Sequence, residues 1–233
     1  MSEQSDRRAR KKAQTRAHVQ AVAHQMFAER GYDAVTIADV ARAADVAVQT
    51  VFNHFPTKEA LFFDGRAPWV HGPADAVRHR TSTECPLSAL TGYLGAFVRE
   101  RIEALQDPDH RRHVRLVAES DALRAHERHL VDECERLLAE ALAEAWAQPA
   151  HDGLVLADPG TTAALTAATW LSAIRALLLR QRPAVTSGAD PAQIGAELQR
   201  LTDQVLDGLA ESADHLLRRL RIAAGQPPTR LAC

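Results

Sequence analysis

The chain contains, at residues 36–62, the stretch TIADVARAADVAVQTVFNHFPTKEALF. Its first apolar residues recur at the spacing of one helix face, which predicts a short helix over Ile37–Ala43. Thr36 precedes this helix and has the side chain of a good N-cap. A second helical pattern covers Val48–Phe55, and Pro56 ends it because proline disfavours helical geometry in the residue before it. The stretch therefore predicts two short helices joined by a tight turn.

This pair has the spacing of a helix-turn-helix, a motif whose second helix enters the major groove of DNA. By its periodicity, the second helix should bury Val48, Val51 and Phe55. The opposite face has no charged residue and carries Gln49, Thr50, Phe52, Asn53 and His54. Neutral polar side chains can bond base edges, and an aromatic ring can contact a thymine methyl group. The pattern therefore favours a DNA-binding helix, and the alternative is a structural helical hairpin with no role in DNA binding.

The charge distribution agrees with a nucleic-acid partner. Residues 1–30 hold seven Lys and Arg against three Asp and Glu, whereas the whole chain has a net charge of −2. A basic N-terminal segment ahead of an acidic remainder is typical of a protein that meets phosphate at one end. The three cysteines are widely spaced and the N-terminus is charged, so we expect neither a disulfide framework nor a signal peptide. With no run of roughly 18 apolar residues, the chain is expected to be cytoplasmic and without membrane contact.

The rest of the sequence indicates an all-α fold. Ala and Leu dominate, and no segment alternates as a strand does. After a frayed polar segment at residues 1–10, a first helix should run to about Arg30 and end at Gly31. Residues 65–86 are rich in Gly and Pro and indicate a broken connector, with one helical stretch around Asp75–Arg80. Long helices should follow at about 87–106, 109–118, 121–147, 160–181 and 191–222.

Three segments together carry a resemblance to a known family. They are Phe27–Tyr32 (FAERGY), Thr36–Ala41 (TIADVA) and Val51–Leu61 (VFNHFPTKEAL). At this spacing they resemble the N-terminal domain of TetR-family repressors, over about residues 10–62. The resemblance implies a three-helix helix-turn-helix domain joined to a larger helical domain that binds a small molecule and forms the dimer.

This resemblance divides the chain into expected parts. We expect a helix-turn-helix DNA-binding domain at residues 1–56, a ligand-binding and dimerisation domain at 57–224 and a disordered tail at 225–233. It also implies a set of DNA-contacting residues, which comprises Thr36, Gln49, Thr50, Phe52, Asn53, His54 and Lys58. Of these, Thr36, His54 and Lys58 match positions that usually meet phosphate, whereas the others match positions that face the groove. The basic run at residues 7–12 resembles the N-terminal arm that approaches the DNA backbone.

Three positions depart from the family pattern. Phe52 stands where Tyr is usual, so a phenolic bond to phosphate is missing. Asp45 stands where Gly is common, but Asp tolerates the left-handed conformation and the turn should survive. Ala47 stands where Ser or Thr commonly caps the second helix, and loss of that cap costs about 1 kcal/mol of local stability. We therefore expect an unusually mobile recognition helix in the absence of DNA.

The larger domain should contain the effector site and the dimer contact. Rows of Leu on the helices at 160–181 and 191–222 could pack a four-helix interface between two subunits, although they could also serve only the monomer core. The candidate ligand-binding residues are Phe97, Arg101, His113, Trp146, Trp170 and Arg175. Arg175 could meet an anionic ligand or an internal carboxylate such as Glu119. Residues 115–146 look similar to family members that bind acyl-CoA-like ligands, an impression to which residues 62–64 add.

Other chemistry is expected to be absent. His110 and His113, and likewise His126 and His129, are spaced to share a helix face, but neighbouring arginines would repel a metal cation. The sequence also has no phosphate-binding glycine loop, no G-x-S-x-G and no H-E-x-x-H motif. We thus expect no metal, no cofactor, no catalytic residue and no enzyme. The resemblance implies a repressor that binds a palindromic operator as a homodimer and leaves it when a small-molecule effector binds; the alternative is a helical metal- or partner-binding protein with no DNA role.

Overall fold

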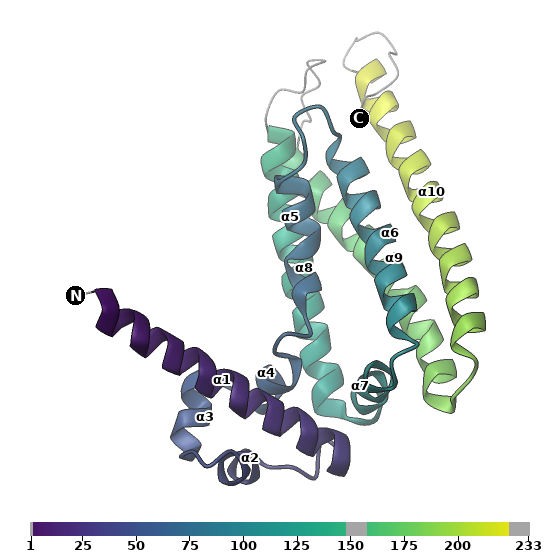
Figure 1. Ribbon diagram of the computed structural model, residues 1–233. Coiled ribbons are helices and arrows are strands. Elements are labelled where there is room, and N and C mark those ends of the chain that lie inside the picture. The colour runs from purple at the N-terminus through teal and green to yellow at the C-terminus, as the bar shows by residue number, and fades with distance from the viewer. Residues whose placement is uncertain (1, 148–157, 224–233) are drawn as a thin grey trace. The chain divides into compact units, whose positions relative to one another are not determined.

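The computed structural model describes residues 2–147 and 158–223 (Figure 1). Within these ranges all regular elements are helical, as the composition predicts. The α-helices and the single 3₁₀ turn η1 are α1 (Ser2–Arg30), α2 (Ile37–Ala43), α3 (Val48–His54), α4 (Lys58–Phe63), η1 (Pro68–Val70), α5 (Gly72–Arg78), α6 (Pro86–Ala104), α7 (Pro108–Glu119), α8 (Asp121–Ala147), α9 (Pro159–Ser187) and α10 (Pro191–Ala223).

The chain forms two compact units. Unit 1 contains the residues up to Ala67 together with Arg115–His126, and unit 2 contains Pro68–Val114 and the residues from Glu127 onward. The C-terminal end of α7 and the first turns of α8 therefore belong to unit 1, while the rest of both helices belongs to unit 2. Such units are defined by packing and not by function, so the expected functional limits at residues 56 and 224 stay predictions.

Unit 1 is built around α1, which packs against α2, α3 and α4. Val19, Ala23 and Phe27 lie on one side of α1 and are at most 1% exposed. The ring of Phe27 lies with its centroid 5.3 Å from that of Tyr32 and 5.8 Å from that of Phe62, and the last two are 5.5 Å apart. This closed group of three rings holds the end of α1, the loop after it and α4 together, because aromatic pairs bury large apolar areas.

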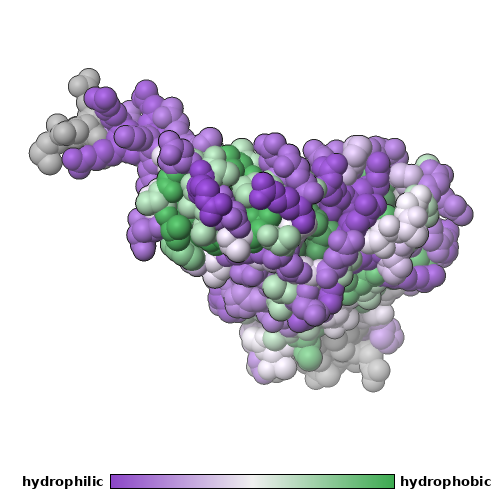
Figure 2. Space-filling model, turned by 90° about the horizontal axis from the view of Figure 1, so that it is seen from below, coloured by the Kyte–Doolittle hydropathy of each residue, from purple (hydrophilic) through white to green (hydrophobic). Residues whose placement is uncertain are grey.

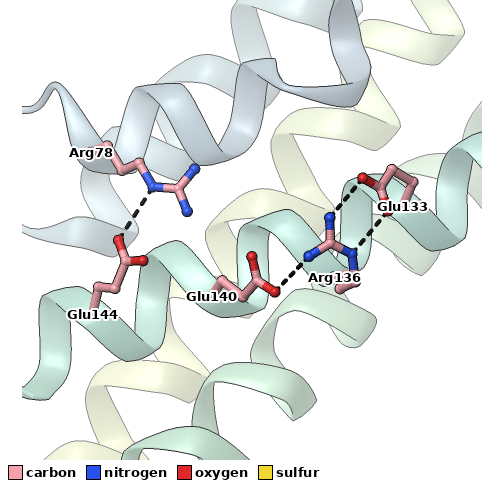
Figure 3. Close-up of polar contacts among 5 residues, drawn as sticks. All are labelled: Arg78, Glu133, Arg136, Glu140 and Glu144. Atoms are coloured by element: carbon pink, nitrogen blue, oxygen red, sulfur yellow. Dashed lines mark hydrogen bonds and ion pairs between the residues drawn. The ribbon is translucent and has the colours of Figure 1, made fainter.

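In unit 2, α6 packs between α5 and α10, and α9 packs against α10. The surface side of α5 is joined to α8 by the ion pair of Arg78 with Glu144, and Arg136 on α8 bonds Glu133 and Glu140 (Figure 3). Exposed pairs of this kind stabilise little. The packing of α6 on α10 is closer and depends on a glycine, since a Cβ at Gly195 would lie only 2.6 Å from the Ile102 side chain.

The helix bounds lie close to the sequence predictions, except that α5 begins at Gly72 and not near Asp75, that η1 is not among the predictions, and that two ends differ more clearly. The first ten residues were expected to fray, but α1 starts at Ser2, because Arg, Lys, Gln and Ala are good helix formers. Helix α9 was expected to end at residue 181, but it passes through Pro183 to Ser187. Proline removes one backbone hydrogen bond, yet Val185 just beyond it is buried in a cluster with Leu105 and Ile194. The expected tail at 225–233 lies outside the described residues.

Replacement of Gly195 by Ala should destabilise the protein, although Ala is the better helix former. The added methyl group would force α6 and α10 apart, and overpacking of this kind costs about 1–3 kcal/mol. Gly92→Ala on α6 is the matched control, because nothing lies within 4 Å of its Cβ position; this variant should gain about 0.5–1 kcal/mol. Urea unfolding of both variants would test the pair, and equal stability changes would contradict the close packing.

Candidate nucleic-acid interface

The turn between α2 and α3 has the geometry that the helix-turn-helix needs. Thr36 caps α2 reciprocally with Asp39: the Thr36 Oγ1 accepts from the Asp39 N–H at 3.1 Å, and the Thr36 N–H donates to the Asp39 carboxylate. Asp45 adopts φ 51°, the left-handed conformation expected at this position. Both expectations from the sequence are confirmed, and they explain how two helices of seven residues can meet at a sharp angle.

The start of α3 has no side-chain cap. Ala47 occupies the N-cap position in extended geometry and makes no capping hydrogen bond, as the sequence predicts. The next helix shows the contrast, because the Thr57 hydroxyl accepts from the Ala60 N–H at 3.0 Å. The N-terminal N–H groups of α3 are therefore left without the side-chain acceptor that α2 and α4 possess.

The packed side of α3 is formed by Val51 and Phe55, which are 0% and 1% exposed. Val48 was expected to lie with them, and that prediction is wrong: it is 41% exposed. Val48 precedes Phe52 by four residues, so the two lie in one row on the helix, and Phe52 is 43% exposed. Val51 and Phe55 pack against the rest of unit 1, whereas Val48 belongs to the free face of α3.

The remaining predicted contact residues of α3 lie on or beside this free face. Gln49 and Asn53 are exposed, and the Gln49 amide donates to the Asn53 side-chain oxygen at 3.2 Å. Thr50 and His54 are half-buried. The pKa of His54 is held below its ordinary value by partial burial and then by the nearby charges of Lys12 and Arg16. A neutral imidazole can donate one hydrogen bond and accept another, and both are useful in a groove.

Arg16 of α1 holds the other end of α3, and the sequence did not single it out. Its Nη1 donates to the His54 carbonyl at 2.6 Å, and its Nη2 bonds the Asp64 carboxylate. The guanidinium carbon lies 4.3 Å from the centre of the Phe55 ring. Carbonyls at a helix C-terminus have no partner within the helix, so Arg16 satisfies one of them and ties α3 to α1 and to the end of α4. Arginine within a basic run gives no sequence signal for this role.

Lys58 has an internal role as well. Its Nζ donates to the Tyr32 carbonyl at 2.6 Å and lies 3.9 Å from the centre of the Tyr32 ring. Burial lowers its pKa, and the nearby Asp33 and Glu59 oppose that shift. The Tyr32 hydroxyl in turn donates to Glu59 at 2.6 Å. Lys58 therefore fastens α4 to the loop after α1, and its expected contact with phosphate stays a prediction.

The N-terminal half of α1 adds positive charge. Residues 6–14 are all exposed, and they include Arg7, Arg8, Arg10, Lys11 and Lys12. Figure 2 shows the coloured part of this end of α1 as mainly hydrophilic. Together with the uncharged free face of α3, which also exposes Val48 and Phe52, this basic segment suits a phosphate backbone beside base edges.

Comparison with known proteins agrees with this geometry. Residues 20–64 match the sequence profile of "Bacterial regulatory proteins, tetR family". The N-terminal domain is a TetR-family domain. The chain is 28% identical over 155 residues to TcmR, an HTH-type transcriptional regulator of Streptomyces glaucescens, and the match covers 65% of this chain and 66% of TcmR. The matched region thus spans slightly less than two thirds of TcmR.

Solved structures share the fold beyond that domain. SmeT in its triclosan complex matches with a TM-score of 0.53 and 19% identity, over 85% of this chain and 90% of SmeT. NalD of Pseudomonas aeruginosa, the secondary repressor of the MexAB-OprM multidrug efflux pump, matches with a TM-score of 0.50 and 20% identity, over 83% of this chain and 95% of NalD. At such identities the likeness establishes a TetR-like fold, with a helix-turn-helix domain and a larger helical part.

The predicted ligand-binding residues all lie in unit 2. Phe97 and Arg101 lie together on α6, with the guanidinium carbon 5.1 Å from the ring centre. Trp170 on α9 is buried, with only 2% of its surface exposed. Among the described residues, Trp146, Trp170 and Arg175 make no hydrogen bond, ion pair or ring contact, and no group of His, Cys, Asp and Glu there could hold a metal ion. Of the predicted residues, Phe97 and Arg101 are brought together on α6.

A cap added to α3 should stabilise unit 1. Ala47→Ser should raise the free energy of unfolding by about 1 kcal/mol, because the extended geometry at residue 47 suits a capping side chain. The matched control removes an existing cap: Thr57→Ala should lower stability by about the same amount. Urea unfolding measures both, and amide exchange of residues 48–54 should slow in Ala47→Ser. Unchanged exchange there would show that α3 is already ordered.

Loss of the Arg16 tie should be more costly than loss of an exposed arginine on the same helix. Arg16→Met should reduce stability by about 1–2 kcal/mol, since it leaves the His54 carbonyl and the Asp64 carboxylate without their donor. Arg10→Met removes only the surface pair with Asp6 and should change stability little. If the two variants unfolded at the same urea concentration, Arg16 would not hold α3.

Proposed function

We propose that this TetR-family protein is a transcriptional regulator that binds a palindromic operator as a homodimer and is released by a small-molecule effector. The observation that carries the proposal is the free face of α3, where Gln49, Asn53 and the apolar row of Val48 and Phe52 are exposed while Val51 and Phe55 are buried. A helix with one packed side and one uncharged free side has the surface needed in the major groove. The alternative of a helical protein without a DNA role leaves this free face unexplained.

In the proposed homodimer, the second subunit would cover the exposed apolar side of α9. Leu165 is 64% and Leu179 36% exposed on this helix. Its most apolar 18-residue window has a mean hydropathy of 1.4 and is 28% buried, so by length and composition α9 could also cross a membrane. We favour a dimer interface with α10, against which α9 already packs, because exposed apolar faces mark protein contacts. A dimer would present two recognition helices to two half-sites.

The effector would bind in unit 2. The fold-related SmeT has been solved with triclosan, and we propose a small-molecule site beside α6, the helix that carries Phe97 and Arg101. The acyl-CoA-like character expected for residues 115–146 stays a prediction. We further propose that the protein is cytoplasmic and has no enzymatic activity, in line with its relative TcmR, a transcriptional regulator.

The effector must favour the state that does not bind DNA, since a ligand shifts an equilibrium only through its different affinities for the two states. Residues 115–126 offer a covalent route for that shift, because they pack in unit 1 while the rest of α7 and α8 lies in unit 2. Within unit 1, the buried Ser120 donates to Asp33 at 2.9 Å, and the His126 ring stacks on Phe63 at 5.3 Å. Movement of α7 or α8 would therefore displace the loop after α1 and the end of α4.

Selection from a randomised pool of double-stranded DNA tests the proposal. The protein should enrich a palindromic site, and its affinity should fall steeply between about 50 and 200 mM salt as counterions are released. Thr50→Ala and Asn53→Ala should relax the sequence preference at single positions, by about 1–3 kcal/mol each. Replacement of Arg7, Lys11 and Lys12 by Gln should weaken all sequences alike and reduce the salt dependence. Absence of both enrichment and salt dependence would contradict the proposed function.

A further inference from the structure

A row of three side chains lies along α6 in unit 2. Tyr93, Phe97 and Arg101 follow one another at intervals of about one helix turn. The rings of Tyr93 and Phe97 are stacked, with their centroids 6.3 Å apart and their planes inclined by only 8°. Arg101 continues the row, with its guanidinium carbon over the Phe97 ring. All three residues are half-buried, so the row is neither core nor open surface.

Arg101 is an exception among the buried polar groups. Its Nε is buried without a hydrogen-bond partner, and no other buried side-chain nitrogen or oxygen in the described part of the chain lacks one. Burial lowers the pKa of Arg101, against the opposing influence of Glu100 and Tyr93. Glu100 is exposed at the next position on the helix, and within the described residues neither it nor any other carboxylate forms an ion pair with Arg101.

A buried guanidinium nitrogen without a hydrogen-bond partner is unfavourable for the fold alone. Buried donors are almost always hydrogen-bonded, because a buried group that has lost water and gained no partner raises the free energy of the folded state. The Phe97 ring offsets part of this cost through its negative face, but a ring cannot accept all the N–H bonds of a guanidinium. The geometry leaves the buried Nε–H of Arg101 without an acceptor in the described part of the chain.

Tyr93 supplies a further donor at the other end of the row. Burial raises its pKa to about 12, although a phenol keeps its proton at neutral pH even at its ordinary pKa. Gly72 makes room for it: a Cβ at that position would lie 1.8 Å from the Tyr93 oxygen. The row therefore presents hydrogen-bond donors at both ends and apolar ring surface between them. A ligand that fits it needs acceptor atoms with negative charge and an apolar body.

We propose that this row is the anion-binding part of the effector site, and that the effector is an organic carboxylate whose carboxylate group binds Arg101 and whose apolar body lies along Phe97 and Tyr93. The planar guanidinium matches a carboxylate with two parallel hydrogen bonds, which makes it the most suitable side chain for this ligand class. The inference rests on the proposed function, because it identifies the chemistry of the effector of that regulator.

The test uses the full-length protein and four probes. They are 1-naphthoate and octanoate, each with its neutral amide. Isothermal titration should show binding of at least one carboxylate, and the matching amide should bind at least about tenfold more weakly. Arg101→Met should lose at least about tenfold in carboxylate affinity, and Arg101→Lys should lose less, because it keeps the charge without the paired donors. Arg99→Met, two residues away and exposed, should bind as the wild type does.

Stability supplies a readout that needs no ligand. Arg101→Met removes a half-buried guanidinium whose buried Nε has no hydrogen-bond partner, so its thermal midpoint without ligand should equal or exceed that of the wild type. A midpoint lowered by more than about 4 °C would show that the guanidinium stabilises the fold, and would overturn the proposal. Equal affinity for carboxylate and amide, or no binding of either carboxylate, would also overturn it.

Failure of this inference can be told apart from failure of the proposed function. DNA binding by the same wild-type preparation is measured on the selected operator. If the protein binds DNA but neither carboxylate, only the assigned effector chemistry is wrong. If it binds no DNA, the proposed regulator is wrong whatever the titrations give. We expect the carboxylate that binds to release the wild-type protein from the operator. This release should be lost in Arg101→Met and kept in Arg99→Met.

Discussion

A helix of seven residues is not stable by itself in water, so α3 exists only because unit 1 holds it. Val51 and Phe55 pack against the unit from one side, and Arg16 binds the carbonyl at the C-terminal end. These contacts leave the opposite side of the helix free. The surface proposed to bind DNA is thus free because only one side and one end of α3 are attached to the rest of unit 1.

The helices that hold α3 are themselves firmly joined. Phe27, Tyr32 and Phe62 form a closed group of rings, and Lys58 ties α4 to the backbone of Tyr32. The rigid frame compensates for a recognition helix that begins without a cap and exposes two large apolar side chains. Functional sites commonly contain such local departures from stable design, offset by the packing around them.

Unit 2 shows comparable departures. The Nε of Arg101 is buried without a partner, and α9 leaves Leu165 mostly exposed. Neither feature stabilises an isolated chain, since one lacks a hydrogen-bond acceptor and the other exposes apolar area to water. Each would be satisfied by a partner, an anion in the first case and a second subunit in the second. The proposed effector and the proposed second subunit would thus account for both features.

The sequence by itself determined the all-helical fold, the helix-turn-helix and most helix ends, because these depend on local signals: the cap at Thr36, the left-handed Gly31 and Asp45, and the regular recurrence of apolar residues. Only the tertiary structure decided that Val48 faces outward and that α9 continues through Pro183. It alone also joined Arg16 to α3, Lys58 to Tyr32 and Tyr93 to Phe97. These features depend on which neighbour covers each side chain. Periodicity cannot distinguish two adjacent rows of side chains on one helix, as at Val48. It also cannot compare the hydrogen bond lost at Pro183 with the burial of Val185 in a cluster of residues distant in sequence.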